Sequence, residues 1–280
     1  METKQKLRCP VCNNEAKHYT KLKDVDLFYC RFCKHRFTDY NSIQKKETYS
    51  VNYFSEKHSN WFNNPNTKLF DHIYKFIDSN FSNKASILDV GCGTGGFLKY
   101  INNKSKKFDL TGIDYYRNEK YQDIEFLYGD ILKEKLNKKY DVVISIMVIE
   151  HVLNVQEFIK RQAELCKDNG FIINVTINEA AFLYKTSRIV NYFNFSTPIN
   201  MLYDKHHLNH FSKNSLEFLH KKNKLKIIEN NLSQFNVESL TLPEANIVLK
   251  KFYKIALLTI FLIEKLILKK NQQTLICQKI

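Results

Sequence analysis

The sequence predicts an α/β protein in which a doubly wound parallel sheet follows a small cysteine-rich module. Three observations predict it: short apolar runs alternate with amphipathic stretches between residues 86 and 177, two Cys-x-x-Cys pairs cluster near the start, and a long apolar segment separates two late strands. A chain of 280 residues is long enough for one large domain with an appended module and an insertion.

Composition narrows the expected setting of the chain. The net charge of +14 would suit a nucleic acid or an anionic membrane surface, but the lysines are scattered among acids, which favours a solvated basic surface. The start, METKQKLRCP, lacks the apolar run of a secretory signal, and the apolar run 255–263 is shorter than the roughly 18–20 residues that span a bilayer. Seven cysteines, an odd number, favour metal ligation over disulfides and a reducing cytoplasm.

Residues 1–45 are expected to form a zinc ribbon. Cys9 and Cys12 are followed, after seventeen residues, by Cys30 and Cys33, a spacing at which two tight knuckles close a tetrahedral thiolate site around Zn²⁺. Four thiolates fill the coordination sphere, so the metal would be structural. The alternative, a thiol–disulfide couple at one pair, is disfavoured because no strand–helix setting surrounds it.

Two further segments complete the expected domain organisation. Residues 46–84 are expected to form a helical bridge, because aromatic and aliphatic residues recur there at helical spacing. Residues 85–280 would form the main domain, with helices at 94–103 and 154–167 and a helical insertion at about 240–271. Its seven expected strands are 86–90, 110–114, 124–129, 140–147, 170–177, 224–230 and 273–279.

A glycine-rich turn joins the first of these strands to the first helix. Residues 87–98 read ILDVGCGTGGFL, and Gly91, Gly93 and Gly95 allow a tight turn whose backbone amides approach a ligand closely. Asp114 ends the next strand, 21 residues beyond Gly93, where a carboxylate can accept both hydroxyls of a ribose. The turn and this acid predict a nucleotide-like cofactor.

The third strand adds a second acid. Asp130 follows it in LYGDI, where the carboxylate and the backbone of Ile131 could meet an adenine edge. The dinucleotide alternative is weaker, because Gly96 stands one position short of the third glycine of G-x-G-x-x-G.

In this order, ILDVGCGTG, GID, GDI and YDVVISIMVIEHV resemble the class I methyltransferases that depend on S-adenosylmethionine (SAM). More narrowly, they resemble the branch that includes ubiquinone-pathway O-methyltransferases and sugar methyltransferases. The resemblance covers about residues 85–232 and implies a Rossmann-like, doubly wound, seven-stranded sheet. It also implies SAM as the cofactor.

The resemblance implies roles for individual residues. The three glycines would line the methionine portion, Asp114 would hold the ribose, and the next acid would border the adenine. Two residues at the end of the fourth strand would lie near the transferable methyl. The implied cofactor-binding set is Asp89, Gly91, Gly93, Gly95, Asp114, Asp130, Ile131, Ser145 and Ile146.

Methyl transfer requires proximity and a base, and histidine suits proton removal near neutral pH. Glu150 and His151 follow the fourth strand, while His207 and His210 lie in the run YDKHHLNHFS at 203–212. We expect these four residues to be catalytic. The alternatives are packing or capping for His151, structural hydrogen bonding for the later histidines, and, less favoured, a metal ion there.

The expected acceptor is a small molecule related to carbohydrates. The ribbon, the EHV element and HHLNHFS resemble enzymes that methylate sugars, nucleotide-sugars or glycan precursors on oxygen or carbon. An RNA base methyltransferase is a weaker alternative, because no Asn-Pro-Pro-Tyr element follows the fourth strand. A non-catalytic SAM-binding scaffold is a third, against which the intact glycine turn argues.

Residues 245–270 are apolar nearly all round, so we expect buried packing, a lid over the substrate pocket or the face of a homo-oligomer. Peripheral contact with the inner membrane face is the alternative. It is kept open by clustered lysines, namely Lys250, Lys251, Lys254, Lys265, Lys269 and Lys270.

Overall fold

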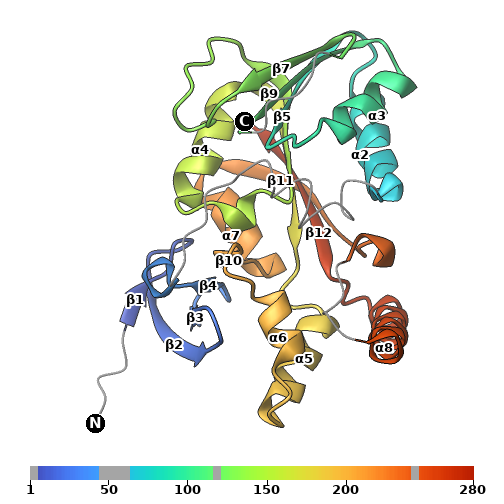
Figure 1. Ribbon diagram of the computed structural model, residues 1–280. Helices are drawn as coiled ribbons and strands as arrows, with labels where there is room; N and C mark the ends of the chain where they lie inside the picture. The colour runs from blue at the N-terminus through green and yellow to red at the C-terminus, as the bar shows by residue number, and fades with distance from the viewer. Residues whose placement is uncertain (1–5, 44–63, 116–120, 241–245) are drawn as a thin grey trace.

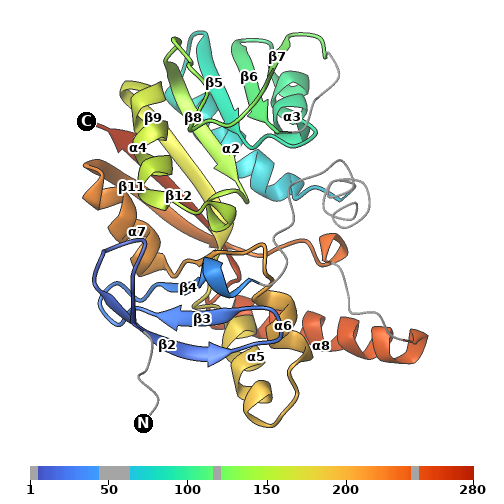
Figure 2. The ribbon, with the colours of Figure 1, turned by 60° about the vertical axis from the view of Figure 1, so that its left-hand side comes forward.

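The computed structural model describes residues 6–43, 64–115, 121–240 and 246–280 and arranges them around two sheets (Figure 1). A seven-stranded sheet with helices on both faces forms one lobe, and a five-stranded sheet lies beside three helices in the other (Figure 2). These helices are α5 (Phe182–Tyr192), α6 (Thr197–Leu202) and α8 (Ile247–Leu266). Among the described residues, no helix has both the length and the apolar character needed to cross a bilayer.

The large sheet has the order β11-β12-β9-β8-β5-β6-β7. Strand β12 runs in the direction opposite to the other six strands. The sequence order reverses at β5, which lies between β8 and β6. The predicted α/β fold with a doubly wound seven-stranded sheet is therefore confirmed. The strands are β5 Ala85–Val90, β6 Phe108–Asp114, β7 Ile124–Tyr128, β8 Tyr140–Ile146, β9 Cys166–Ile177, β11 Leu225–Ser233 and β12 Gln272–Lys279.

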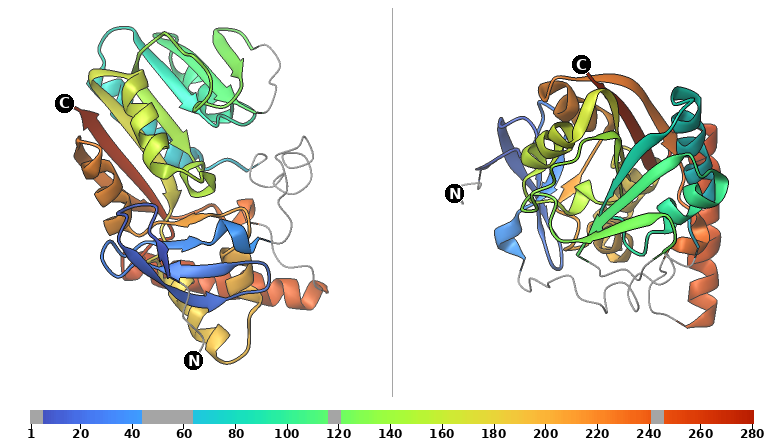
Figure 3. Two further views of the ribbon diagram at one scale, coloured as in Figure 1. Left: turned by 90° about the vertical axis from the view of Figure 1, so that its left-hand side faces the viewer. Right: turned by 90° about the horizontal axis from the view of Figure 1, so that it is seen from above.

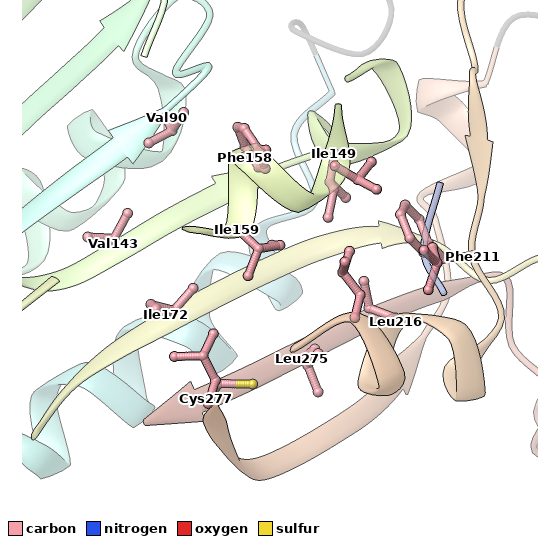
Figure 4. Close-up of a cluster of buried hydrophobic side chains, with 14 of the residues drawn as sticks. Val90, Val143, Ile149, Phe158, Ile159, Ile172, Phe211, Leu216, Leu275 and Cys277 are labelled. Carbon is pink, nitrogen blue, oxygen red and sulfur yellow. The ribbon is translucent and has the colours of Figure 1, made fainter. Parts of the chain in front are cut away.

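Helices cover both faces of this sheet, and the first strand shows why. All six residues of β5 are buried, as expected for a strand covered on both sides. Because side chains alternate, Ile87 packs in one apolar cluster with Ile73 and Leu98, while Leu88 packs in another with Phe158 and Leu216 (Figure 4). The first cluster lies under α2 Thr67–Asn80 and α3 Gly96–Lys104, and the second under α4 Val155–Leu165 and α7 Lys213–Lys222.

The N-terminal module is a small antiparallel sheet that the main domain extends by one strand. Strand β10 (Asn209–His210) pairs with β4, with Asn209 opposite Phe37 and His210 opposite Arg36. The module therefore shares a sheet with a segment about 170 residues further along the chain. Its own elements are β1 Lys6–Arg8, β2 Glu15–Lys21, β3 Asp26–Tyr29, β4 Arg36–Thr38 and η1 Tyr40–Ser42.

Helices α5 (Phe182–Tyr192) and α6 (Thr197–Leu202) follow β9 and were not predicted from the sequence. They pack on the N-terminal module through an apolar cluster that includes Leu27, Tyr184 and Tyr203 (Figure 3). Short 3-10 turns complete the described elements: η3 Ile149–His151 and η4 Val237–Ser239.

The expected helical insertion is present as α8 (Ile247–Leu266), between β11 and β12. Of the expected placements, buried packing applies to only part of the helix, because Phe261 and Glu264 are its only buried residues. Of the expected bridge 46–84, residues 46–63 lie outside the described part of the chain, and α2 (Thr67–Asn80) forms most of the remainder.

Candidate active site

A cavity of about 1730 Å³ lies at the carboxyl ends of the parallel strands, where the strand order reverses. Ligands of open α/β sheets bind at this kind of switch point. One end of the cavity is lined by the glycine turn and by the acids that follow β6 and β7. Its other walls come from α5, α6 and α8 and are mostly apolar, with Leu183, Val190, Met201 and Leu257 among the lining residues.

The glycine turn has a backbone shape that favours glycine. Gly91, Gly93 and Gly95 have φ values of 72°, 53° and 76°, in the region that L side chains rarely adopt. A Cβ on Gly95 would lie 2.6 Å from Phe126 Cζ, and one on Gly91 would overlap Val148 Cγ2. The turn therefore presents bare backbone to the cavity, as predicted.

Two carboxylates lie directly behind the turn. Asp114 Oδ2 accepts a hydrogen bond from the Gly93 amide at 2.8 Å. Asp89 is 2% exposed, and its Oδ1 has no hydrogen-bond partner among the described residues. Burial, and secondarily the charge of Asp114, raises the pKa of Asp89 to about 8. A buried acceptor beside a second carboxylate fits a ligand that carries positive charge and hydrogen-bond donors, as SAM does.

Asp130 and Ile131 line the cavity after β7, as expected for the adenine end. Asp130 Oδ1 accepts from the Leu132 amide at 3.0 Å, which fixes the loop. Ile146, at the end of β8, also lines the cavity.

Ser145 is not where the sequence reasoning put it. Its side chain is fully buried and donates to Asn174 Oδ1, inside a polar network that also includes Gln162 and His220. Because neighbouring strand residues point to opposite faces, Ile146 faces the cavity and Ser145 faces away from it.

Two of the predicted catalytic residues, His151 and His207, line the cavity. Their rings lie 4.8 Å apart, centroid to centroid. His151 Nδ1 pairs with the carbonyl of His206 at 2.8 Å, and a carbonyl only accepts, so Nδ1 carries the hydrogen. The Nε2 atom of neutral His151 is then the nitrogen with the lone pair that a base needs.

Glu150 lies beneath these histidines and does not line the cavity. It is fully buried, its Oε2 accepts from Thr176 Oγ1 at 2.7 Å, and burial raises its pKa to about 7. Potential ligand atoms of Glu150, His151 and His207 lie within 4.8 Å of one another, so the three could also hold a metal ion. Because Glu150 does not line the cavity, the prediction that it contacts the reacting groups directly is not supported by its placement.

His210 is excluded from a direct role by its burial. It is fully buried, pairs through β10 with the N-terminal module, and packs against the Tyr203 ring. Burial holds its pKa well below the ordinary value. The prediction that His210 contacts the reacting groups is therefore wrong, and its position in β10 is structural.

The N-terminal module holds the His207 loop in place. The Thr38 amide donates to the Leu208 carbonyl at 2.9 Å, and Thr38 Oγ1 donates to the His207 carbonyl at 3.0 Å. On the other side, the Leu208 amide donates to the Glu150 carbonyl at 2.8 Å. Tyr40 of the same module lines the cavity. Sequence reasoning missed Thr38 and Tyr40, because nothing local relates them to the histidines.

A buried charge network joins the module to the helices over the cavity. Arg36 and Arg188 both donate to Glu179 Oε1, and Tyr203 donates to the same oxygen at 2.7 Å. These residues were also missed. The helical spacing of Leu183, Tyr184 and Val190 is a signal that could have revealed α5.

The four clustered cysteines meet, as predicted. Cys9 Sγ lies 3.6 Å from Cys33 Sγ, and Cys12 Sγ lies 3.4 Å from Cys30 Sγ. A tetrahedral site with Zn–S bonds of about 2.3 Å requires sulfur atoms about 3.8 Å apart, whereas a disulfide requires about 2.05 Å. The cluster therefore fits zinc ligation and no disulfide.

The fold, the bare glycine turn and its paired carboxylates define a SAM-dependent methyltransferase of class I. A family model described as "Methyltransferase domain" matches residues 61–230, and the chain belongs to this family. The ubiquinone biosynthesis O-methyltransferase of Rickettsia canadensis is 34% identical over 171 residues, which cover 54% of this chain and 70% of that relative. The enzyme of the same name from Rickettsia conorii is 38% identical over 122 residues, covering 40% and 42%.

Solved structures agree at the level of the fold alone. A SAM-dependent methyltransferase from Archaeoglobus fulgidus superimposes with a TM-score of 0.52 at 18% identity, covering 81% of this chain and 99% of that one. Magnesium protoporphyrin IX methyltransferase from Synechocystis, with bound S-adenosylhomocysteine, gives 0.51 at 11% identity and covers 84% and 90%.

The expectation of a carbohydrate acceptor, whether sugar, nucleotide-sugar or glycan precursor, is overturned by these relatives. They are named for O-methylation in ubiquinone biosynthesis and not for work on a sugar. The physical reason for the error is that the matching motifs form the cofactor end of the cavity, while the walls away from the glycine turn come from α5, α6 and α8.

Proposed function

We propose that this protein transfers the methyl group of SAM to a hydroxyl oxygen of a small, largely apolar acceptor. The observation that carries the proposal is one continuous cavity, which joins the glycine turn, His151 and His207 to apolar walls from α5, α6 and α8. Such a cavity suits an acceptor with one polar reacting group. The relatives' name supports O-methylation and suggests a hydroxylated aromatic ring with an apolar substituent.

The proposed reaction is an in-line displacement. When bound, SAM supplies a methyl carbon activated by the sulfonium; the oxygen–carbon bond forms as the carbon–sulfur bond breaks. His151 Nε2 takes the hydroxyl proton while the His206 carbonyl holds Nδ1–H at 2.8 Å, and His207 packs beside the ring. Apolar walls orient the acceptor and exclude water.

The test is a product assay with mass detection. The purified protein is incubated with SAM and a panel of phenols and catechols that differ in the length of an apolar substituent. We expect S-adenosylhomocysteine and an O-methylated product, with kcat/KM rising with the substituent. The Asp114→Ala variant serves as a control with weakened SAM binding, by about 1–3 kcal/mol. Methylation only at carbon or nitrogen would overturn the proposal.

We also propose that Cys9, Cys12, Cys30 and Cys33 bind one structural Zn²⁺. The backbone supports this, because the residue after each pair, Asn13 or Lys34, has a positive φ of 62° or 61° and donates back to the first cysteine's carbonyl. The two pairs are thus matching knuckles. Metal analysis of the purified protein should find one zinc per chain, and Cys12→Ser should abolish it. A chain that purifies folded and zinc-free would contradict this assignment.

A further inference from the structure

Helix α8 carries apolar side chains on two opposite faces. The inner face lies against α5. Figure 1 views α8 nearly end-on and shows the helix at the edge of the molecule. This face includes the buried Phe261 and Glu264. The cavity-lining residues on it are Tyr253, Ala256, Leu257 and Ile260.

The outer face is formed by a stripe of exposed apolar residues. They recur at intervals of four, three, seven and four positions, which places them on one side of a helix. Their exposed fractions range from 60% to 78%, so folding of this chain buries little of them. An exposed apolar row of this length marks an interaction surface. We call it the outer stripe: Val248, Phe252, Ile255, Leu262 and Leu266.

The exposed charged side chains of α8 are all positive. Its only acidic residue, Glu264, is fully buried, where it accepts from the Leu183 amide at 2.9 Å. All four lysines of the helix are exposed, and among them Lys254 pairs with Glu238 at 3.0 Å. The exposed surface of the helix is therefore apolar and cationic. The lysines are Lys250, Lys251, Lys254 and Lys265.

This charge pattern decides between two occupants of the stripe. A second copy of the chain would bring lysines against lysines in either orientation of the two helices, and no exposed acid on α8 would offset them. A bilayer that contains anionic phospholipids offers acyl chains to the stripe and phosphates to the lysines. The net charge of +14 adds long-range attraction to such a surface.

We propose that α8 lies on the surface of an anionic phospholipid bilayer with its outer stripe inserted among the lipid chains. Phe252 belongs to the stripe and also lines the cavity, so the bilayer would lie beside one cavity wall. The proposal does not depend on which acceptor is methylated, because it concerns binding of the protein to lipid.

Vesicle sedimentation tests it, with the zinc-loaded full chain and without SAM or acceptor. We expect the protein to pellet with vesicles of phosphatidylcholine plus phosphatidylglycerol, and at least about ten-fold less with phosphatidylcholine alone. Binding to the anionic vesicles should weaken as salt is added. The double variant Ile255→Glu/Leu262→Glu should bind at least about ten-fold more weakly than the wild type.

The matched control replaces two exposed apolar residues far from α8, Ile228 and Ile280, with glutamate. The C-terminus lies at the opposite end of the molecule from α8 in Figure 1. This variant should pellet like the wild type. SAM binding by both variants verifies that they are folded, and charge reversal in Lys251→Glu/Lys265→Glu supplies a second test that keeps the stripe intact.

Three outcomes would overturn the proposal. The wild type fails to pellet with anionic vesicles; or both double glutamate variants bind equally well; or light scattering finds a dimer that Ile255→Glu/Leu262→Glu dissociates while vesicles bind neither form. The last result would assign the stripe to a second copy of the chain.

Discussion

Asp89 and Asp114 place two carboxylates behind a turn of bare backbone. In the free site, burial and the charge of Asp114 both disfavour the ionised form of Asp89. With its pKa at about 8, Asp89 is mostly protonated at pH 7. The folded protein then holds a proton that the unfolded chain has released, so this group makes the free protein less stable as pH rises from about 4 to 8. A cationic ligand would favour the ionised form and reverse part of this cost.

We therefore predict that SAM affinity depends on pH through Asp89. If the ligand prefers the ionised carboxylate, affinity rises with pH up to about 8, by at most about ten-fold per pH unit, and then levels off. Calorimetric titration from pH 6 to 9, in buffers of different ionisation enthalpy, should show proton release at pH 7. The cofactor's own amino group also titrates in this range.

The control for that prediction is Asp89→Asn, which removes the titrating group and leaves the cofactor unchanged. The difference between the two pH profiles isolates the contribution of Asp89. Parallel profiles would show that Asp89 does not respond to the ligand's charge.

The second prediction concerns His151. His151→Gln keeps a side chain that can contact the His206 carbonyl but removes the basic nitrogen, so kcat for the acceptor should fall about 10²–10⁴-fold. SAM affinity should stay within about three-fold, because the glycine turn is untouched. His72→Gln, a change at a partly exposed histidine on α2, is the matched control and should leave kcat unchanged. Unaltered turnover in His151→Gln would remove His151 as the base.

At this scale, sequence reasoning succeeded where a residue's role is local. Gly91 and Asp114 follow their strands directly, so motif and position determine their placement. The prediction for Ser145 was wrong because neighbouring residues of a strand face opposite sides, so a shift of one position decides which of them faces the cavity. His210 failed because its burial depends on β10 pairing with the distant β4.

Among the elements, the strands were predictable and the helices over the cavity were not. The central parallel strand β5 is buried on both faces, so its residues are mostly apolar and the strand can be recognised from the sequence. Helix α5 carries Tyr184 and Ser187 among its buried residues, so its inner face is not purely aliphatic. Helix α8 was found as a helix, but its exposed stripe cannot be told from a buried one by composition.

The network around Glu179 allows a prediction about the contact between elements. Arg36 is in β4 of the N-terminal module and Glu179 follows β9, and both are nearly fully buried. Removing the guanidinium in Arg36→Met leaves Glu179 with Arg188 and Tyr203 only. The free energy of unfolding should fall by about 3 kcal/mol, as measured by chemical denaturation.

An exposed ion pair of the same module provides the comparison. Lys6 and Glu15 pair at 2.9 Å with side chains 63% and 46% exposed, so Lys6→Met should cost no more than about 1 kcal/mol. Equal effects of the two substitutions would show that the buried network contributes nothing beyond a surface pair.

In the whole molecule, hydrogen bonds connect the N-terminal module to the main domain beside the part of the cavity that His207 lines. Strand β10 completes the sheet of the N-terminal module, and His207 lies in the loop just before this strand. Further contacts are the His35–Asn209 pair at 3.2 Å and the Ser212 hydroxyl, which donates to the Lys34 carbonyl at 3.0 Å. The module would thus set the position of a residue of the active site without touching the glycine turn, which is built by β5 and β6.

We therefore predict that removing zinc impairs acceptor turnover more than cofactor binding. If the four cysteines hold the proposed Zn²⁺, a module of this size would depend on the metal to fold, so chelation should release β4 from β10 and free the His207 loop. A displacement of His207 by about 1 Å can lower the rate about 10²-fold. We therefore expect kcat/KM for the acceptor to fall at least about ten-fold, while the SAM dissociation constant changes by less than about three-fold. Thr38→Val, which deletes only the hydroxyl bonded to the His207 carbonyl, should lower kcat/KM in the zinc-loaded protein by a smaller factor. Equal loss of SAM binding and turnover on chelation would instead mean that the zinc supports the whole fold, and retention of both would mean that the module does not position His207.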